Sequence, residues 1–185
     1  MPEPKRITAP LTKETIAGLR AGDGVLLSGV IYTARDAAHK KLVELLKEGT
    51  DLPFDLEGQV IYYVGPTPAP PGYPIGSAGP TTSGRMDSYT PLLIEHGLRG
   101  MIGKGPRSGA VLDAVKKFGA VYFAATGGAA ALIARSIKKA EVVAYPELGA
   151  EAIRKLEIQD FPCIVAADIY GGDLYKEGPE KYREA

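Results

Sequence analysis

The sequence contains few or none of several residue types on which specialised classes of protein depend. It has no tryptophan and a single cysteine, Cys163, so an internal disulfide is excluded, and one thiol by itself holds neither an iron–sulfur cluster nor a structural zinc ion. Neither sign of charge is in excess, because lysine plus arginine equals aspartate plus glutamate at 22 each. The overall charge therefore gives no case for nucleic acid or an anionic membrane surface as a partner.

Long apolar runs are missing as well. No stretch approaches the roughly 20 residues of a membrane span, and the N-terminal Met-Pro-Glu-Pro-Lys-Arg lacks the apolar region of a signal peptide. We therefore expect a cytoplasmic protein. With 185 residues, 45% of them hydrophobic and 24% charged, the chain is expected to form one globular domain over residues 1–185 without stabilising disulfides.

The chain does alternate apolar, β-rich runs with helical patterns, and this alternation predicts an α/β domain. Helices are expected after the caps Thr12, Thr33 (in a capping box with Asp36), Thr90 (with Pro91) and Ser108, and from Gly128 to about Ile137; Gly49 and Gly119 are expected to end two of them. Strands are expected at 25–32, 60–64, 98–102, 120–125, 142–145 and 163–169. Residues 1–11 are interpreted as extended and peripheral, and 151–159 is ambiguous.

The turn-rich segment 76–87 carries the clearest functional pattern. It places two adjacent hydroxyls, Thr81 and Thr82, shortly before Arg85, with glycines on both sides that let the backbone approach a ligand closely. The segment ends a long loop, because residues 65–84 contain six prolines and five glycines, and such loops are usually functional or disordered. The structural alternative is a connector in which Arg85 forms a local salt bridge.

Two further cations lie at turns. Arg35 falls in the first turn of its predicted helix, where the helix dipole disfavours a cation unless an anion is close. A helix N-terminus with a guanidinium is a good anion site, although Asp36 is an equally available partner for Arg35. Lys104 stands between two glycines directly after a predicted strand, a position that is also typical of a solvated loop lysine.

Two arginines, one lysine and two threonine hydroxyls suit a small dicarboxylate better than a phosphate, since each arginine can bind one carboxylate. The two histidines support no metal site. His39 lies four residues after Arg35 and is a candidate for the same helix face, whereas His96 is expected to serve the end of its helix. Cys163 is expected in the core.

Several segments, in order along the chain, resemble the β-subunit or C-terminal domain of class I fumarate hydratases and of the related tartrate dehydratases. The matching stretches are Tyr32-Thr-Ala-Arg-Asp-Ala-Ala-His39, Tyr63-Val-Gly-Pro-Thr-Pro68, Gly79-Pro-Thr-Thr-Ser-Gly-Arg-Met-Asp87, Thr90-Pro91, Gly103-Lys-Gly105, Gly127-Gly-Ala-Ala-Ala131 and Asp173-Leu-Tyr175.

The resemblance implies a swivelling β/β/α fold and an iron–sulfur-dependent hydro-lyase that hydrates fumarate to malate. It implies a partner α-subunit that carries a [4Fe–4S] cluster, in an assembly of two α and two β chains. Carried onto this sequence, it makes Thr81, Thr82 and Lys104 catalytic groups and Arg35, Arg85, Gly79 and Asp87 substrate-binding groups, with His39 and Asp36 as further candidates.

Two alternatives stay open. The same residues suit a dehydratase that acts on tartrate or another hydroxy-dicarboxylate. A free-standing dicarboxylate-binding or regulatory module, without a catalytic partner, is a hypothesis of another class.

Overall fold

The computed structural model describes residues 3–183. Its strands are β1 (Lys5–Ala9), β2 (Gly24–Thr33), β3 (Val60–Tyr62), β4 (Gly100–Gly103), β5 (Val121–Ala124), β6 (Ile137–Ala144) and β7 (Ile153–Ala167). Its helices are α1 (Lys13–Ala17), α2 (Asp36–Glu48), α3 (Thr90–Glu95), α4 (Gly109–Phe118), α5 (Ala130–Ala134) and α6 (Leu174–Tyr182), with 3₁₀ turns η1 (Ser83–Met86) and η2 (Pro146–Glu151).

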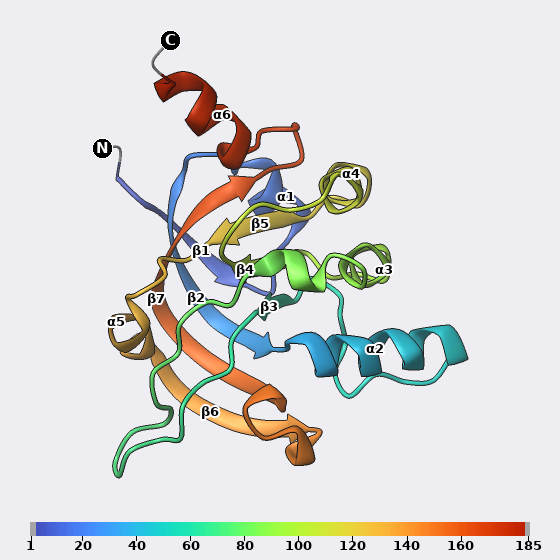
Figure 1. Ribbon diagram of the computed structural model, residues 1–185, viewed down its shortest axis with the longest axis vertical. Coiled ribbons are helices and arrows are strands. Elements are labelled where there is room, and N and C mark those ends of the chain that lie inside the picture. The colour runs from blue at the N-terminus through green and yellow to red at the C-terminus, as the bar shows by residue number, and fades with distance from the viewer. Residues whose placement is uncertain (1–2, 184–185) are drawn as a thin grey trace.

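The strands form one mixed sheet that curls into a small barrel (Figure 1). The strand order is β1-β2-β3-β4-β5-β7-β6, and the additional pairing of β2 with β7 closes the ring. Neighbours from β1 to β5 run parallel, whereas β7 runs antiparallel to β2, β5 and β6. This architecture confirms the α/β prediction.

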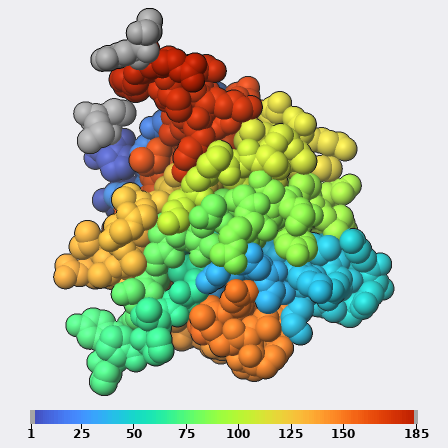
Figure 2. Space-filling view, viewed as in Figure 1, coloured from blue at the N-terminus to red at the C-terminus, as the bar shows by residue number. Residues whose placement is uncertain are grey.

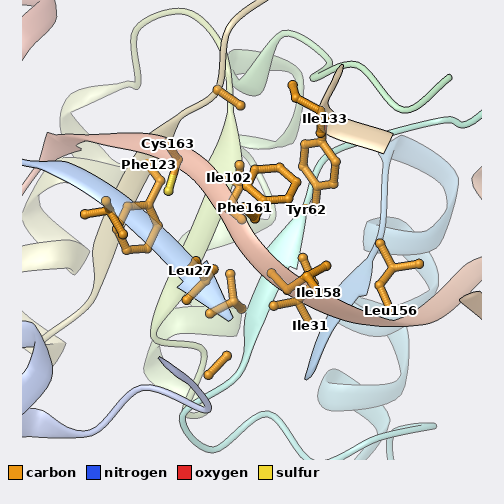
Figure 3. Packing of buried hydrophobic residues seen from close by; sticks show 14 of the residues in the cluster. Leu27, Ile31, Tyr62, Ile102, Phe123, Ile133, Leu156, Ile158, Phe161 and Cys163 are labelled. Atoms are coloured by element: carbon orange, nitrogen blue, oxygen red, sulfur yellow. The ribbon is translucent and has the colours of Figure 1, made fainter. Parts of the chain in front are cut away.

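The parallel strands β3, β4 and β5 are buried on both faces, as parallel strands covered by helices usually are. One apolar cluster fills the barrel, where Leu27, Tyr62 and Phe161 are among its members (Figure 3). The alternate residues, such as Ile61 next to Tyr62, belong to a second cluster on the outside of the barrel. Cys163 lies in the first cluster and is 6% exposed, which confirms its prediction as a core residue.

Helices α2, α3 and α4 lie together on one side of the barrel (Figure 1) and cover the second cluster with Leu42, Leu93 and Val115. Their ends follow predicted local signals. The Ser108 side chain accepts a hydrogen bond from the Val111 amide at the start of α4, and Gly119, with φ of 76°, ends that helix. Thr12 likewise caps α1, and Gly49 ends α2 in the left-handed region with φ of 67°.

The predictions were wrong where pairing between distant segments decides the structure. Residues 5–9 are extended and mostly exposed, as predicted, but they form an edge strand parallel to β2 that buries Ala9, a pairing that the sequence did not predict. Helix α5 ends at Ala134, and Ile137 already belongs to β6. The ambiguous residues 151–159 and the predicted strand 163–169 belong mostly to one strand, β7, in which register shifts break the two-residue alternation that marks a strand.

Helix α6 was not predicted, and Thr90 is the first residue of α3 and not its cap. The Thr90 hydroxyl instead donates to the Met86 carbonyl, 2.9 Å away. Among residues 3–183, no helix combines the length and the apolar character that crossing a bilayer requires.

Candidate active site

The junction between β2 and α2 presents Arg35 at the start of a helix. Arg35 is the N-cap residue of α2, with φ of −125° and ψ of −160°, and no side chain of its own segment caps the helix. The predicted capping box was wrong, because Thr33 is the last residue of β2 and fully buried. Its hydroxyl donates to the Ala152 carbonyl (3.2 Å) and accepts from the Arg154 amide (3.0 Å), so it binds the start of β7.

The Arg35 guanidinium lies close to two carboxylates. Its Nη2 is 3.8 Å from Asp36 Oδ2 and 3.6 Å from Glu151 Oε1. These distances are those of charge contacts and exceed the range of hydrogen bonds, and Arg35 Nε is buried without a partner among the described residues. A Cβ added at Gly65 would collide with Arg35 Nη1, so the guanidinium lies directly against that glycine. Arg35 is thus held in place by charge and close packing, and neither carboxylate accepts a hydrogen bond from its Nη2.

Arg85 converges on the same carboxylate from a distant part of the chain. It belongs to η1, and its Nε donates to Asp36 Oδ1 at 2.9 Å. The structural alternative considered for Arg35 therefore occurs, because Asp36 balances its charge. Arg85 also forms a salt bridge, but with a residue 49 positions away and not the local one considered from the sequence. The two ion pairs share Asp36, and this sharing places the two guanidinium groups beside each other, with half of the Arg85 side chain exposed (52%).

The hydroxyl pair and Lys104 form a second group of candidate residues. The Thr81 amide donates to the Tyr63 carbonyl (2.7 Å), and the Lys104 amide donates to the Thr81 carbonyl (3.2 Å). Thr82 and Lys104 are consequently paired in a short parallel bridge, and both are exposed. The Lys104 side chain passes over Gly127, where an added Cβ would lie 3.7 Å from Nζ.

The end of β3 connects the two groups. Tyr63 binds Thr81 through its backbone, and Gly65, two residues later, supports Arg35. Gly79 lies close to the start of α5, because an added Cβ there would be 3.0 Å from the Ala130 Cβ. The structure thus brings Arg35, Asp36, Arg85, Thr81, Thr82 and Lys104 to one region of the molecule, and gives Gly79 a packing contact beside it.

Asp87 is engaged within the chain. Its Oδ1 accepts from Arg107 Nε at 2.7 Å and its Oδ2 from the Ser108 amide at 2.6 Å. Arg107 has a fully buried side chain, donates from Nη2 to the Thr90 hydroxyl at 3.0 Å, and lies over the Tyr122 ring. This contact network fixes the residues that follow Arg85.

Burial by itself lowers the pKa of Arg107, but the surrounding tyrosines and Asp87 more than offset this effect and leave the pKa raised. Arg107 therefore stays a cation. The sequence interpretation did not single out Arg107. Its position shortly after Gly103-Lys-Gly105, where a buried strand ends in a polar run, is a feature from which a functional or structural role could have been predicted.

His39 is completely buried and supports the turn that carries Arg35. Its Nδ1 lies 2.9 Å from the Arg35 carbonyl oxygen, and its ring meets Tyr63 edge to face at 5.2 Å between centroids. Burial lowers the pKa of His39 to about 4, so the ring is neutral at pH 7. Nδ1 must then carry the proton to donate to the carbonyl, which leaves Nε2 as an acceptor without a partner among residues 3–183.

Glu151 is the other residue that sequence reasoning missed. It lies in the segment left ambiguous, and η2 brings it against the start of α2 (Figure 2, orange against blue). His96, by contrast, lies as predicted at the end of α3, with Nδ1 2.8 Å from the Leu92 carbonyl oxygen. The described residues contain no group of three or more His, Cys, Asp or Glu side chains arranged to hold a metal ion.

Comparison with known proteins identifies the family. The family model described as "Fumarase C-terminus" matches residues 4–178. The class I anaerobic fumarate hydratase of Escherichia coli K12 is 50% identical over 153 residues, which are 82% of this chain and 28% of that protein. Fumarate hydratase 2 of Leishmania major is 43% identical over 167 residues, 89% of this chain and 29% of that protein.

One relative matches along nearly its whole length. The putative L(+)-tartrate dehydratase subunit beta of Methanocaldococcus jannaschii is 42% identical over 180 residues, 94% of this chain and 92% of that protein. The chain thus spans less than a third of the fumarate hydratases named above but nearly all of this subunit. Its match to the family model over residues 4–178 shows that the chain belongs to the fumarase C-terminus family.

Proposed function

We propose that this chain is the non-cluster subunit, or C-terminal domain, of a fumarase-type hydro-lyase, in which it binds and orients a small dicarboxylate. The observation that carries the proposal is the convergence of Arg35 and Arg85 on one carboxylate, together with the link through the end of β3 to the exposed Thr82 and Lys104. Two guanidinium groups with unused donors offer paired N–H groups to carboxylate oxygens.

The iron–sulfur cluster implied by the family resemblance does not fit the described residues of this chain. The only cysteine is buried inside the barrel, and those residues contain no alternative ligand group. In our proposal the cluster, with its Lewis-acid chemistry, belongs to a cluster-bearing α-subunit. The larger size of the fumarate hydratase relatives supports this division, since more than two thirds of each lies outside the aligned region.

In the proposed reaction, water is added reversibly across the double bond of the dicarboxylate. Arg35 and Arg85 hold the carboxylates, and the Thr81–Thr82 hydroxyls lie near the reacting carbons. A threonine is a weak base at its free pKa, so a neighbour must take up the proton that its hydroxyl would lose. We propose Lys104 in its neutral form, whose backbone pairs with that of Thr82, or a carboxylate of the partner subunit. Asp87 acts through Arg107 on the position of η1, and Asp36 and His39 support the arginines.

The second candidate is a tartrate dehydratase β-subunit. It is favoured by the match with the M. jannaschii protein, which extends over 92% of that relative. Both candidates require the same two arginines, so the substrate is the property that distinguishes them.

The test is anaerobic co-expression of this chain with a cysteine-bearing α-subunit, reconstitution of the cluster, and assay on malate, fumarate and tartrate. We expect the reconstituted complex to turn over either malate and fumarate or tartrate, and we expect neither chain alone to be active. Arg85→Ala should lower kcat/KM. The fall should correspond to a loss of at least ~2 kcal/mol of transition-state stabilisation, as expected for a lost charged contact. Arg6→Ala, which removes an exposed ion pair with Asp160 elsewhere, is the control. A cluster-loaded complex that turns over no dicarboxylate would refute the proposal.

A further inference from the structure

The η2 turn is firmly attached to the end of the strand that precedes Arg35. The Arg154 guanidinium donates to the carbonyl oxygens of Gly149 (2.9 Å) and Ala150 (3.3 Å) in this turn and to that of Ala152 (3.1 Å), the residue that follows it. The Thr33 hydroxyl, on the last residue of β2, binds the same junction through Ala152 and Arg154. The last residue of η2, Glu151, therefore has a defined position relative to Arg35.

The Glu151 carboxylate occupies the N-terminus of α2. Its Oε2 accepts from the Ala37 amide at 2.8 Å, and its Oε1 lies 3.6 Å from Arg35 Nη2. An anion is favourable at a helix N-terminus, and α2 has no side-chain cap of its own. A residue 114 positions away in the chain thus provides the cap.

The same carboxylate also acts on Arg35. Glu151 and Asp36 lie 3.6 Å and 3.8 Å from Nη2, and Gly65 lies directly against Nη1, so these three residues restrict where the guanidinium points. Neither carboxylate is within hydrogen-bond distance of Nη2, so the charge is balanced while the Nη2 donors form no hydrogen bond with these carboxylates and are left for another anion. Holding a binding group in its bound orientation lowers the free-energy cost of binding.

We infer that Glu151 is a positioning residue that orients Arg35 for a substrate carboxylate. This role rests on the proposed function of the site. Glu151 itself does not contact the substrate, because its two oxygens face Ala37 and Arg35.

The test compares Glu151→Gln with Glu147→Gln in the reconstituted complex. The amide oxygen of the substituted glutamine side chain can still accept from Ala37, so the helix cap is kept and only the charge toward Arg35 is lost. Glu147 belongs to the same η2 turn but pairs with Lys41 at 3.4 Å and is 60% exposed. We expect Glu151→Gln to raise KM by about 5–10-fold and to leave kcat within about twofold of the wild type, because ground-state binding is weakened. Glu151→Asp keeps the charge and should recover part of the loss in KM. Glu147→Gln should have the same KM and kcat as the wild type.

A double-mutant cycle separates positioning from general structural support. In an Arg35→Ala background, Glu151→Gln should cause no further rise in KM, because the group that it positions is gone. An equal rise in both backgrounds, an unchanged KM or a lower KM would each overturn the role of Glu151 and leave the proposed function intact. A wild-type complex without turnover on any dicarboxylate would overturn the proposed function, and this role with it.

Discussion

Gly65→Ala provides a sharp test of the position of Arg35, because the structure shows what a methyl group at residue 65 would meet. The three nearest heavy atoms to an added Cβ all belong to Arg35: Nη1 inside van der Waals contact, Cδ at 3.4 Å and Cζ at 3.5 Å. Gly65 does not have a positive φ, so alanine fits the backbone. The substitution should therefore act on the guanidinium alone.

The magnitude follows from the displacement. To reach the roughly 3.5–4.0 Å separation of relaxed carbon contacts, the end of the Arg35 side chain must move by about 1 Å. A 1 Å misplacement of a substrate-binding group can cost ~100-fold in rate. We expect kcat/KM for the dicarboxylate to fall by about 10–100-fold, which corresponds to about 1.4–2.7 kcal/mol.

The assay is steady-state kinetics of the reconstituted complex, with urea denaturation of the chain to monitor folding. Gly109→Ala is the matched control, since an added Cβ there meets nothing within 4 Å and φ is not positive. In an Arg35→Ala background, Gly65→Ala should have no further effect, because the clash disappears. A Gly65→Ala enzyme with wild-type kcat/KM would refute the position that the structure gives to Arg35.

Three further predictions concern buried groups. Since burial lowers the pKa of His39 to about 4, below the unfolded value of about 6.5, the unfolded chain binds the extra proton first. The free energy of unfolding should fall as pH drops from about 6.5 towards 4, by up to about 1.4 kcal/mol per pH unit, and His39→Gln should remove this component in urea titrations at each pH. Arg107→Met leaves the Asp87 carboxylate, 14% exposed, without its cation and should destabilise the fold by about 3–5 kcal/mol; a loss below about 1 kcal/mol in urea denaturation would contradict this. Burial raises the pKa of the Cys163 thiol, so iodoacetamide should modify Cys163 only in denaturant, and mass spectrometry that finds rapid alkylation of the native protein would show that the barrel is open.

The sequence alone determined the features that depend on short stretches of chain. The caps at Thr12 and Ser108 and the glycines that end α2 and α4 lie where local hydrogen bonding and backbone freedom place them. The ordered motifs around Arg35, Arg85 and Lys104 were sufficient to identify the family, which the match over residues 4–178 confirms. These signals are readable because each is complete within a few residues.

Only the tertiary structure decided what depends on segments far apart in the chain. Thr33 binds the start of β7 and not its own helix, because the pairing of β2 with β7 brings the Ala152 carbonyl within reach. Glu151 acquires its contact with Arg35 in the same way, across 116 positions (151 minus 35). The sequence pattern was enough to predict Arg35 as a carboxylate-binding residue. Which two carboxylates lie against its guanidinium depends on the fold, because the closure of the barrel determines which chain segments meet at the N-terminus of α2.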